Sequence, residues 1–219
     1  MFLKDIPIFE TEYGVASLTL RNIPWRQDAF IRILSSLEPE GLIRECAGFC
    51  RACGAERIFV SGDGVPKEFS LHATLLTMKR SSGQMEKSDA ALFPVTEQTA
   101  EEFRSLYNTH MHKVPNAAFM SSEDAKEMLC KGDGYFVHRN GALLGLGRVS
   151  DGAIDVVIAV KPGAGKDVVC ALAELITEDT ITMTVAAESP TSPVPTPAPS
   201  DAIIYQNHSI TGSPNSKYF

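Results

Sequence analysis

The chain has 219 residues, of which 44% are apolar and 21% are charged, and its formal net charge is −7. A chain of this length and composition buries a substantial core, as one large domain or as two small ones. The negative charge argues against nucleic acid or an anionic membrane as the main partner, because either favours a clustered basic face.

No run of about 18 apolar residues occurs, so we expect no membrane span. The N-terminus lacks the basic region, apolar stretch and small-residue cleavage site of a secretory signal. Three of the five cysteines fall between residues 46 and 53, and an odd, crowded set is a poor disulfide framework. We therefore expect a cytoplasmic protein with free thiols.

The N-terminal part predicts strands around one amphipathic helix. The helix is expected over 39–54, where apolar and cysteine side chains recur three and four residues apart and Gly54 provides a stop. The stretch 30–34 fits a strand or the start of a helix, whereas the polar residues 81–91 indicate a linker. Further strands are predicted at 15–20, 57–61 and about 71–78.

The remainder alternates strands and helices. Thr99 followed by Glu102 suggests a capping box, and Ser121 or Ser122 with acids behind it suggests a second helix start. Five prolines within 189–199 exclude a helix or an inner strand there and predict an extended loop. The predicted strands are 93–95, 134–138, 142–149, 153–160 and 181–187, and the predicted helices are 99–108, 121–131 and 167–176.

The order of elements after residue 93, with the turn after strand 153–160, resembles the GNAT superfamily of acyl-CoA N-acyltransferases. In that family Val-x-Pro precedes a Gln/Arg-x-x-Gly-x-Gly/Ala element. Here Val160-x-Pro162 is kept, and a shortened turn contains Gly163 and Gly165. Asp167 and Val169 stand where the family usually has glycines.

The resemblance implies an acetyl-CoA site. In the family the backbone of the fourth strand aligns the pantetheine arm, and amides of the following turn and helix hold the pyrophosphate, as helix N-termini hold anions in general. The residues that it assigns to this site are Ile158, Ala159, Val160, Gly163, Ala164, Gly165, Lys166, Asp167 and Val168.

The stretch 49–58, Phe-Cys-Arg-Ala-Cys-Gly-Ala-Glu-Arg-Ile, resembles the helix-then-strand part of the same fold. The whole chain is therefore similar to a bacterial two-part GNAT-like family. The implied fold is α/β, with a mixed, mostly antiparallel sheet flanked by helices. We expect a partial GNAT-like unit at 1–80, the linker at 81–91 and the acyltransferase domain at 92–219.

The resemblance also implies two catalytic residues. An acidic residue on the fourth strand often serves as general base toward the amine, and Asp155 occupies that strand; an ordinary outward-facing strand residue is the equal alternative. Glu188 is a lesser candidate for the base. The family's tyrosine, which protonates the leaving thiolate, has its nearest match in Tyr205, although the spacing differs by one residue.

Two further patterns could bind metal. Cys46, Cys50 and Cys53 have the spacing of an iron–sulfur motif, but i, i+4, i+7 is also one face of a helix, which we favour. His110 and His112 lack an evident third ligand, and a solvated loop is the better interpretation. We therefore predict no metal site.

The implied function is transfer of an acetyl group from acetyl-CoA to the amine of a small-molecule or amino-acid-like acceptor. A homodimer is left open. The alternative is a catalytically degenerate GNAT-like protein that serves as a ligand-binding or interaction module. The retained Val-x-Pro turn favours the enzyme, and the altered loop and tail favour the alternative.

Overall fold

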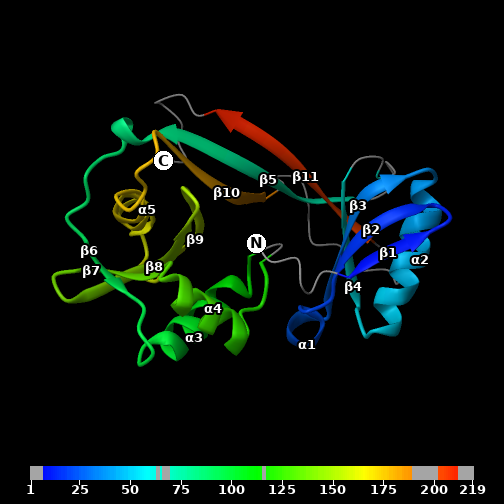
Figure 1. Cartoon of the computed structure of the whole chain (residues 1–219), viewed down its shortest axis with the longest axis horizontal. Helices are drawn as coiled ribbons and strands as arrows, with labels where there is room; N and C mark the ends of the chain where they lie inside the picture. Colours follow the sequence, from blue (N-terminus) through cyan, green and yellow to red (C-terminus); the bar gives the residue numbers. More distant parts are fainter. Residues whose placement is uncertain (1–6, 63–64, 66–69, 115–116, 189–201, 212–219) are drawn as a thin grey trace. The chain divides into compact units, whose positions relative to one another are not determined.

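A computed structural model describes residues 7–62, 65, 70–114, 117–188 and 202–211, with the backbone alone at 70–76, 84, 185–188 and 202–211. The predicted proline-rich loop 189–199 lies outside the described residues. The chain divides into two compact units (Figure 1). Unit 1 comprises the described parts of 1–75 and 186–208, and unit 2 comprises those of 76–185 and 209–219.

Unit 1 is a mixed sheet covered by one long helix. Its sheet order is β1-β2-β3-β4-β11, antiparallel from β1 to β3 and parallel from β3 to β11. The elements are β1 (Ile8–Thr11), β2 (Gly14–Thr19), α1 (Ile23–Arg26), β3 (Asp28–Ser36), α2 (Pro39–Ala52), β4 (Arg57–Ser61) and β11 (Ala202–Thr211). The predicted helix at 39–54 is confirmed, and the ambiguous stretch 30–34 is a strand because it pairs on both sides.

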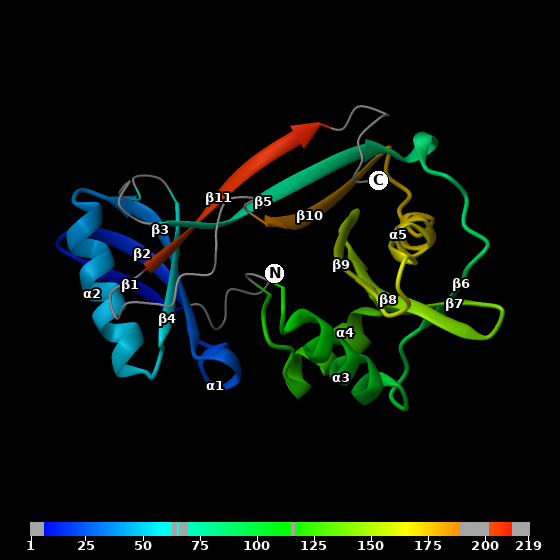
Figure 2. The same cartoon turned by 180° about the vertical axis from the view of Figure 1, so that it is seen from behind.

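Unit 2 carries helices on both faces of a second mixed sheet, whose order is β5-β10-β9-β8-β7-β6. Helix α5 packs on one face of β7, β8 and β9, and α3 and α4 pack on the other (Figures 1 and 2). The elements are β5 (Ser70–Ser81), which begins in unit 1, a 3-10 turn (Ser82–Gln84), β6 (Ala91–Pro94), α3 (Ala100–Met111), α4 (Ser122–Lys131), β7 (Gly134–Arg139), β8 (Ala142–Ser150), β9 (Ala153–Ala159), α5 (Gly165–Ala173) and β10 (Thr180–Glu188).

The predicted fold class is confirmed. From β6 to β10 the chain runs strand, two helices, three-stranded meander, helix, strand, which is the GNAT-like order expected from the sequence. Strands β6 to β9 pair antiparallel, and β9 pairs parallel with β10. A helix that follows a strand and returns to a parallel neighbour covers the sheet face between them.

Local signals explain most of the element boundaries. Asn140 and Gly141 both have positive φ, of 53° and 76°, as a two-residue hairpin turn between right-twisted strands requires. Helix α4 begins after Ser121, one of the two predicted starts, and Ser121 forms a capping box with Asp124. The capping box expected at Thr99 is absent, because Thr99 has helical rather than extended backbone angles and its hydroxyl accepts a hydrogen bond from the Thr96 amide.

Two glycines on β8 let α5 approach the sheet closely. A Cβ on Gly147 would lie 2.2 Å from Leu172 Cδ1 and 2.8 Å from the carbonyl oxygen of Val156. A Cβ on Gly145 would lie 2.7 Å from Val168 Cγ2. Both α5 side chains are fully buried, so they have little room to move aside.

We expect Gly147→Ala to destabilise unit 2 by about 1–3 kcal/mol, since overpacking forces side chains and backbone to shift. Urea unfolding monitored by circular dichroism measures the change. Gly83→Ala is the matched control, because an added Cβ there meets nothing within 4 Å. Equal stability of the two variants would contradict the close packing of α5.

Candidate functional site

A β-bulge opens the sheet of unit 2 between β9 and β10. In the pairing with β8, Arg148 lies opposite Val156 and Val149 lies opposite Ile154, so Asp155 is the extra residue. The parallel register with β10 joins only Thr182 to Ala153 and Met183 to Ile154 within the described backbone. A bulge bends its strand and increases the local twist, so β9 leaves β10 at Asp155.

Beyond the bulge, one edge of β9 presents backbone groups that β8 does not use. The Val160 amide donates to the Leu144 carbonyl of β8 at 3.0 Å. Backbone direction alternates along a strand, so Ile158 also faces β8, whereas Val157 and Ala159 face the side from which β10 has diverged. Of the three residues predicted to align a pantetheine arm, Ile158, Ala159 and Val160, only Ala159 faces that side.

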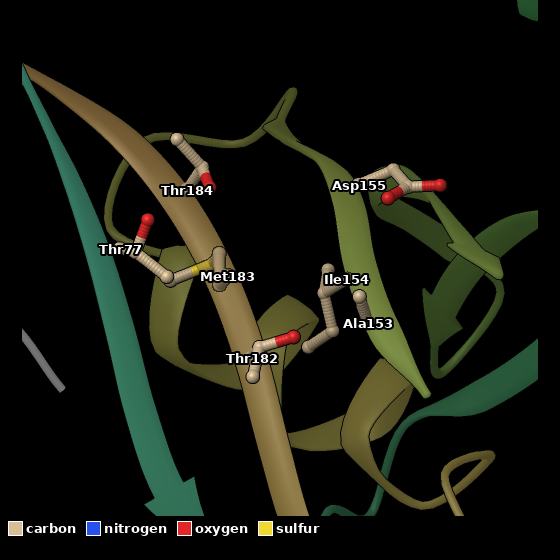
Figure 3. Close-up of a pocket in the computed structure, with 7 residues that line it drawn as sticks. All are labelled: Thr77, Ala153, Ile154, Asp155, Thr182, Met183 and Thr184. Atoms are coloured by element: carbon tan, nitrogen blue, oxygen red, sulfur yellow. The ribbon is translucent and has the colours of Figure 1, made fainter. Parts of the chain in front are cut away.

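A small hollow of about 120 Å³ lies where the two strands part. It is lined by Thr77, Ala153, Ile154, Asp155, Thr182, Met183 and Thr184. Figure 3 shows the Thr182 hydroxyl directed from β10 toward β9 and the Asp155 carboxylate on the side of β9 away from β10. There the Ser150 hydroxyl donates a hydrogen bond to Asp155 Oδ2. The carboxylate therefore borders the hollow but points to the β8 side of β9.

The N-terminus of α5 presents unused amides to open space. The structure offers no acceptor, among the residues it describes, for the N–H groups of Gly163, Gly165, Lys166 and Asp167. An added Cβ at Gly163 or Gly165 would meet nothing within 4 Å. Such amides, with the positive end of the helix dipole, form an anion site.

Two of the predicted cofactor residues are already engaged. The Ala164 amide donates to the Lys161 carbonyl at 3.1 Å, and the Val168 amide donates to the Ala164 carbonyl at 3.0 Å. Both side chains are buried in the core under α5. These two residues stabilise the turn, and the amides that stay free belong to residues 163 and 165–167.

Side chains around this N-terminus form ion pairs with one another. Arg139 of β7 bonds to Asp167 at 2.8 Å and to Asp89 at 3.0 Å. Lys166 bonds to Glu86, and this hydrogen bond holds the Glu86 pKa below its usual value and the Lys166 pKa above. The carboxylate of Asp167 thus has a cationic partner and does not confront a phosphate alone.

The donors present fit a pyrophosphate. Its charge requires several convergent N–H groups, and the free amides at 163 and 165–167 supply them from a turn with no side chain in the way. The ion pairs beside them join two cations to three carboxylates, so these side chains carry a net charge of −1, and backbone dipoles carry most of the attraction. Lys161 is exposed and adds one cation.

Tyr205 and Glu188, the two candidates for chemistry near the C-terminus, both lie on strands. Tyr205 lies on strand β11 rather than on a helix, and it pairs with Ser61 of β4 in unit 1. Glu188 is the last residue of β10. Only the backbone is described at both positions, so their proposed roles stay predictions.

The cysteine pattern of α2 belongs to a helix, as predicted, and two of its members are core residues. Cys46 and Cys50 are fully buried, whereas Cys53 is exposed and ends the helix. Burial raises the pKa of Cys46 to about 11 and that of Cys50 to about 12. Among the described residues no cluster of three metal-ligating side chains occurs. His110 lies in the last turn of α3 rather than in a loop.

We expect iodoacetamide at neutral pH to modify Cys53 and Cys130, which are exposed, and to leave Cys46 and Cys50 intact. The thiolate is the reactive form, and the raised pKa values keep both buried thiols protonated. Peptide mass spectrometry measures the extent of reaction, with urea-unfolded protein as the fully reactive control. Modification of Cys50 as fast as Cys53 would contradict its burial.

No protein-family model and no curated protein matches the chain. A conserved protein of unknown function from Staphylococcus epidermidis has 9% identity and a TM-score of 0.54, with 85% of this chain and 86% of that chain covered. GCN5-related N-acetyltransferases from Sphaerobacter thermophilus and Kribbella flavida align with TM-scores of 0.49 and 0.47 at 12% and 13% identity. The two alignments cover 82% and 85% of this chain. They cover 69% of the Sphaerobacter chain and 53% of the Kribbella chain.

The similarity to the Staphylococcus protein is one of fold, over most of both chains. Within the described part of the chain, no helix has the length and apolar character to cross a bilayer.

Proposed function

We propose that unit 2 is an acyl-CoA-dependent N-acyltransferase that transfers an acetyl group to the amine of a small acceptor. The observation that carries this proposal is the conjunction, within one unit, of the opening between β9 and β10 with the open amides at the start of α5. The first suits a narrow chain such as a pantetheine arm, and the second suits the diphosphate at its end.

Acetyl-CoA as the donor explains both features. Its pyrophosphate would bind the amides of Gly163 and residues 165–167, and its amide-bearing arm would extend β9 along Val157 and Ala159. The thioester would then lie toward the hollow beside Asp155. A hollow of about 120 Å³ is small against the roughly 300–1,000 Å³ of sites that enclose whole ligands, so it suits the short acyl end.

In the proposed reaction the acceptor nitrogen attacks the thioester carbon. A nitrogen–carbon bond forms, the carbon–sulfur bond breaks, and CoA leaves as a thiolate that takes up a proton. Asp155 accepts the proton that the amine loses, from the β8 side of β9. Positioning the two substrates contributes most of the rate enhancement. Tyr205 of β11 is the residue that the family resemblance assigns as the acid that protonates the thiolate.

A ligand-binding protein without transferase activity is the second candidate. The strand conformation of 202–211 favours it, because the family's helix with its tyrosine is not formed at that segment. The enzyme has to bind acetyl-CoA at the α5 turn, whereas the second candidate need not, so binding and turnover have to be measured separately.

Acetyl-CoA at about 100 times its Kd is expected to stabilise the protein by about 2.7 kcal/mol. Gly165→Asp should abolish the shift, because a carboxylate at the start of α5 occupies the anion site while it stabilises the helix. Differential scanning fluorimetry with acetyl-CoA and CoA measures the effect. Gly83→Asp places the same change in open space elsewhere and should keep the shift. No shift at millimolar acetyl-CoA would refute the cosubstrate.

Asp155→Asn is expected to lower kcat by about 10²- to 10⁴-fold, the usual contribution of a general base. The thermal shift with acetyl-CoA should be unchanged, because the side chain points away from β10. Release of the CoA thiol, detected with a chromogenic disulfide in the presence of small amines, reports turnover. Asp151→Asn, in the adjacent turn, is the control, since asparagine tolerates its positive φ of 46°. Activity in Asp155→Asn equal to that in the control would exclude Asp155 as the base.

A further inference from the structure

Next to Asp155, strand β8 carries an arginine whose partner is buried. Arg148 bonds through Nε and Nη2 to Oδ2 of Asp133, at 2.9 Å in both cases. The Asp133 residue is only 6% exposed. A buried carboxylate requires a permanent cation nearby, so Asp133 holds the Arg148 guanidinium in place.

This guanidinium keeps donors to spare. Arginine has five N–H groups, and the Asp133 bonds use two of them. No other acceptor for Arg148 lies among the residues that the structure describes. Its side chain is 26% exposed, so the remaining donors are within reach of a ligand. A fixed arginine with free donors is suited to a carboxylate.

The side chains of Arg148 and Asp155 lie on the same face of the sheet. Arg148 lies opposite Val156, which packs in the core beneath α3 and α4. Ser150, two residues further along β8, shares its face and donates its hydroxyl hydrogen bond to Asp155. Arg148 and Ser150 are about 7 Å apart along the strand. A cationic group and a carboxylate therefore neighbour one another on this face without forming an ion pair together in the described structure.

We propose that the acceptor is a free α-amino acid, whose carboxylate binds Arg148 and whose amine is delivered to Asp155. This inference rests on the proposed acyltransferase function and adds the substrate class. An α-amino acid carries its carboxylate and its amine one carbon apart, and this suits a fixed guanidinium and a carboxylate that lie on one face of two neighbouring strands. Asp133 acts as a positioning residue, since it touches Arg148 and not the substrate.

The test compares free amino acids with their carboxamides, which keep the amine and lose the negative charge. Thiol release from acetyl-CoA is measured with each pair of acceptors. The wild-type protein should favour the free acids by about 10-fold or more in kcat/KM, as charge-assisted hydrogen bonds imply. The double variant Asp133→Asn/Arg148→Met should raise KM for the acids by about 10- to 100-fold and change the values for the amides far less.

The double variant removes both charges, so no buried carboxylate is left without its cation. Arg148→Lys keeps the charge at Asp133 and should retain part of the preference, although it loses the planar fork. Arg104→Met on α3 removes an arginine that pairs with the exposed Glu101 and is the control. A wild-type protein that acetylates amides as well as acids, or a double variant that keeps the preference, would overturn the inference alone. Absence of thiol release with every acceptor would overturn it together with the proposed function.

Discussion

The bulge at Asp155 is the constraint on which the rest of unit 2 depends. One extra residue in β9 ends the parallel pairing with β10 after two residue pairs. The same residue frees the edge at Val157 and Ala159 and places a carboxylate next to the resulting opening. A regular β9 strand would have continued to pair with β10, and the hollow and the exposed edge would both be absent. The candidate site is therefore a consequence of the interrupted pairing, and apolar clusters pack on both faces of the strands around it.

Unit 1 has the same succession of elements, but its own extra residue, Leu34 of β3, lies beyond the pairing of β3 with β4. Strands β1 to β3, helix α2 and strand β4 repeat the order of β7 to β9, α5 and β10. The register of β3 with β4 is continuous over five residue pairs, from Asp28 with Arg57 to Arg32 with Ser61. Helix α2 begins with Pro39, which has no amide proton, behind the carboxylate of Glu38. The start of α2 is therefore a poorer anion site than the start of α5, and for this reason we place the ligand in unit 2.

The sequence predicts the elements of this fold better than it predicts the site. Hairpin turns, the Ser121 cap and the helix face with Cys46 depend on neighbouring residues, and local patterns report them. The bulge depends on how β9 pairs with β8. The apolar pattern of residues 153–160 is the same whether or not the strand contains a bulge. Arg139 with Asp167, and Arg148 with Asp133, come together from separate elements, so no spacing in the sequence announces them. The capping box predicted at Thr99 does not form, because a sequence motif fixes residue types but not backbone angles.

The short turn before α5 is compatible with the proposed anion site. A long glycine-rich loop supplies amides to a diphosphate when the helix start alone has too few. Here Gly163 and the first three residues of α5 leave four amides without an acceptor in the described structure. Asp167 in this first turn interacts favourably with the helix dipole, and it forms an ion pair with Arg139, which is shared with Asp89. Side chains at 167 and 169, where the GNAT family usually has glycines, are then compatible with the proposed anion site, because those positions lie inside the helix, where a side chain does not obstruct the approach to its end.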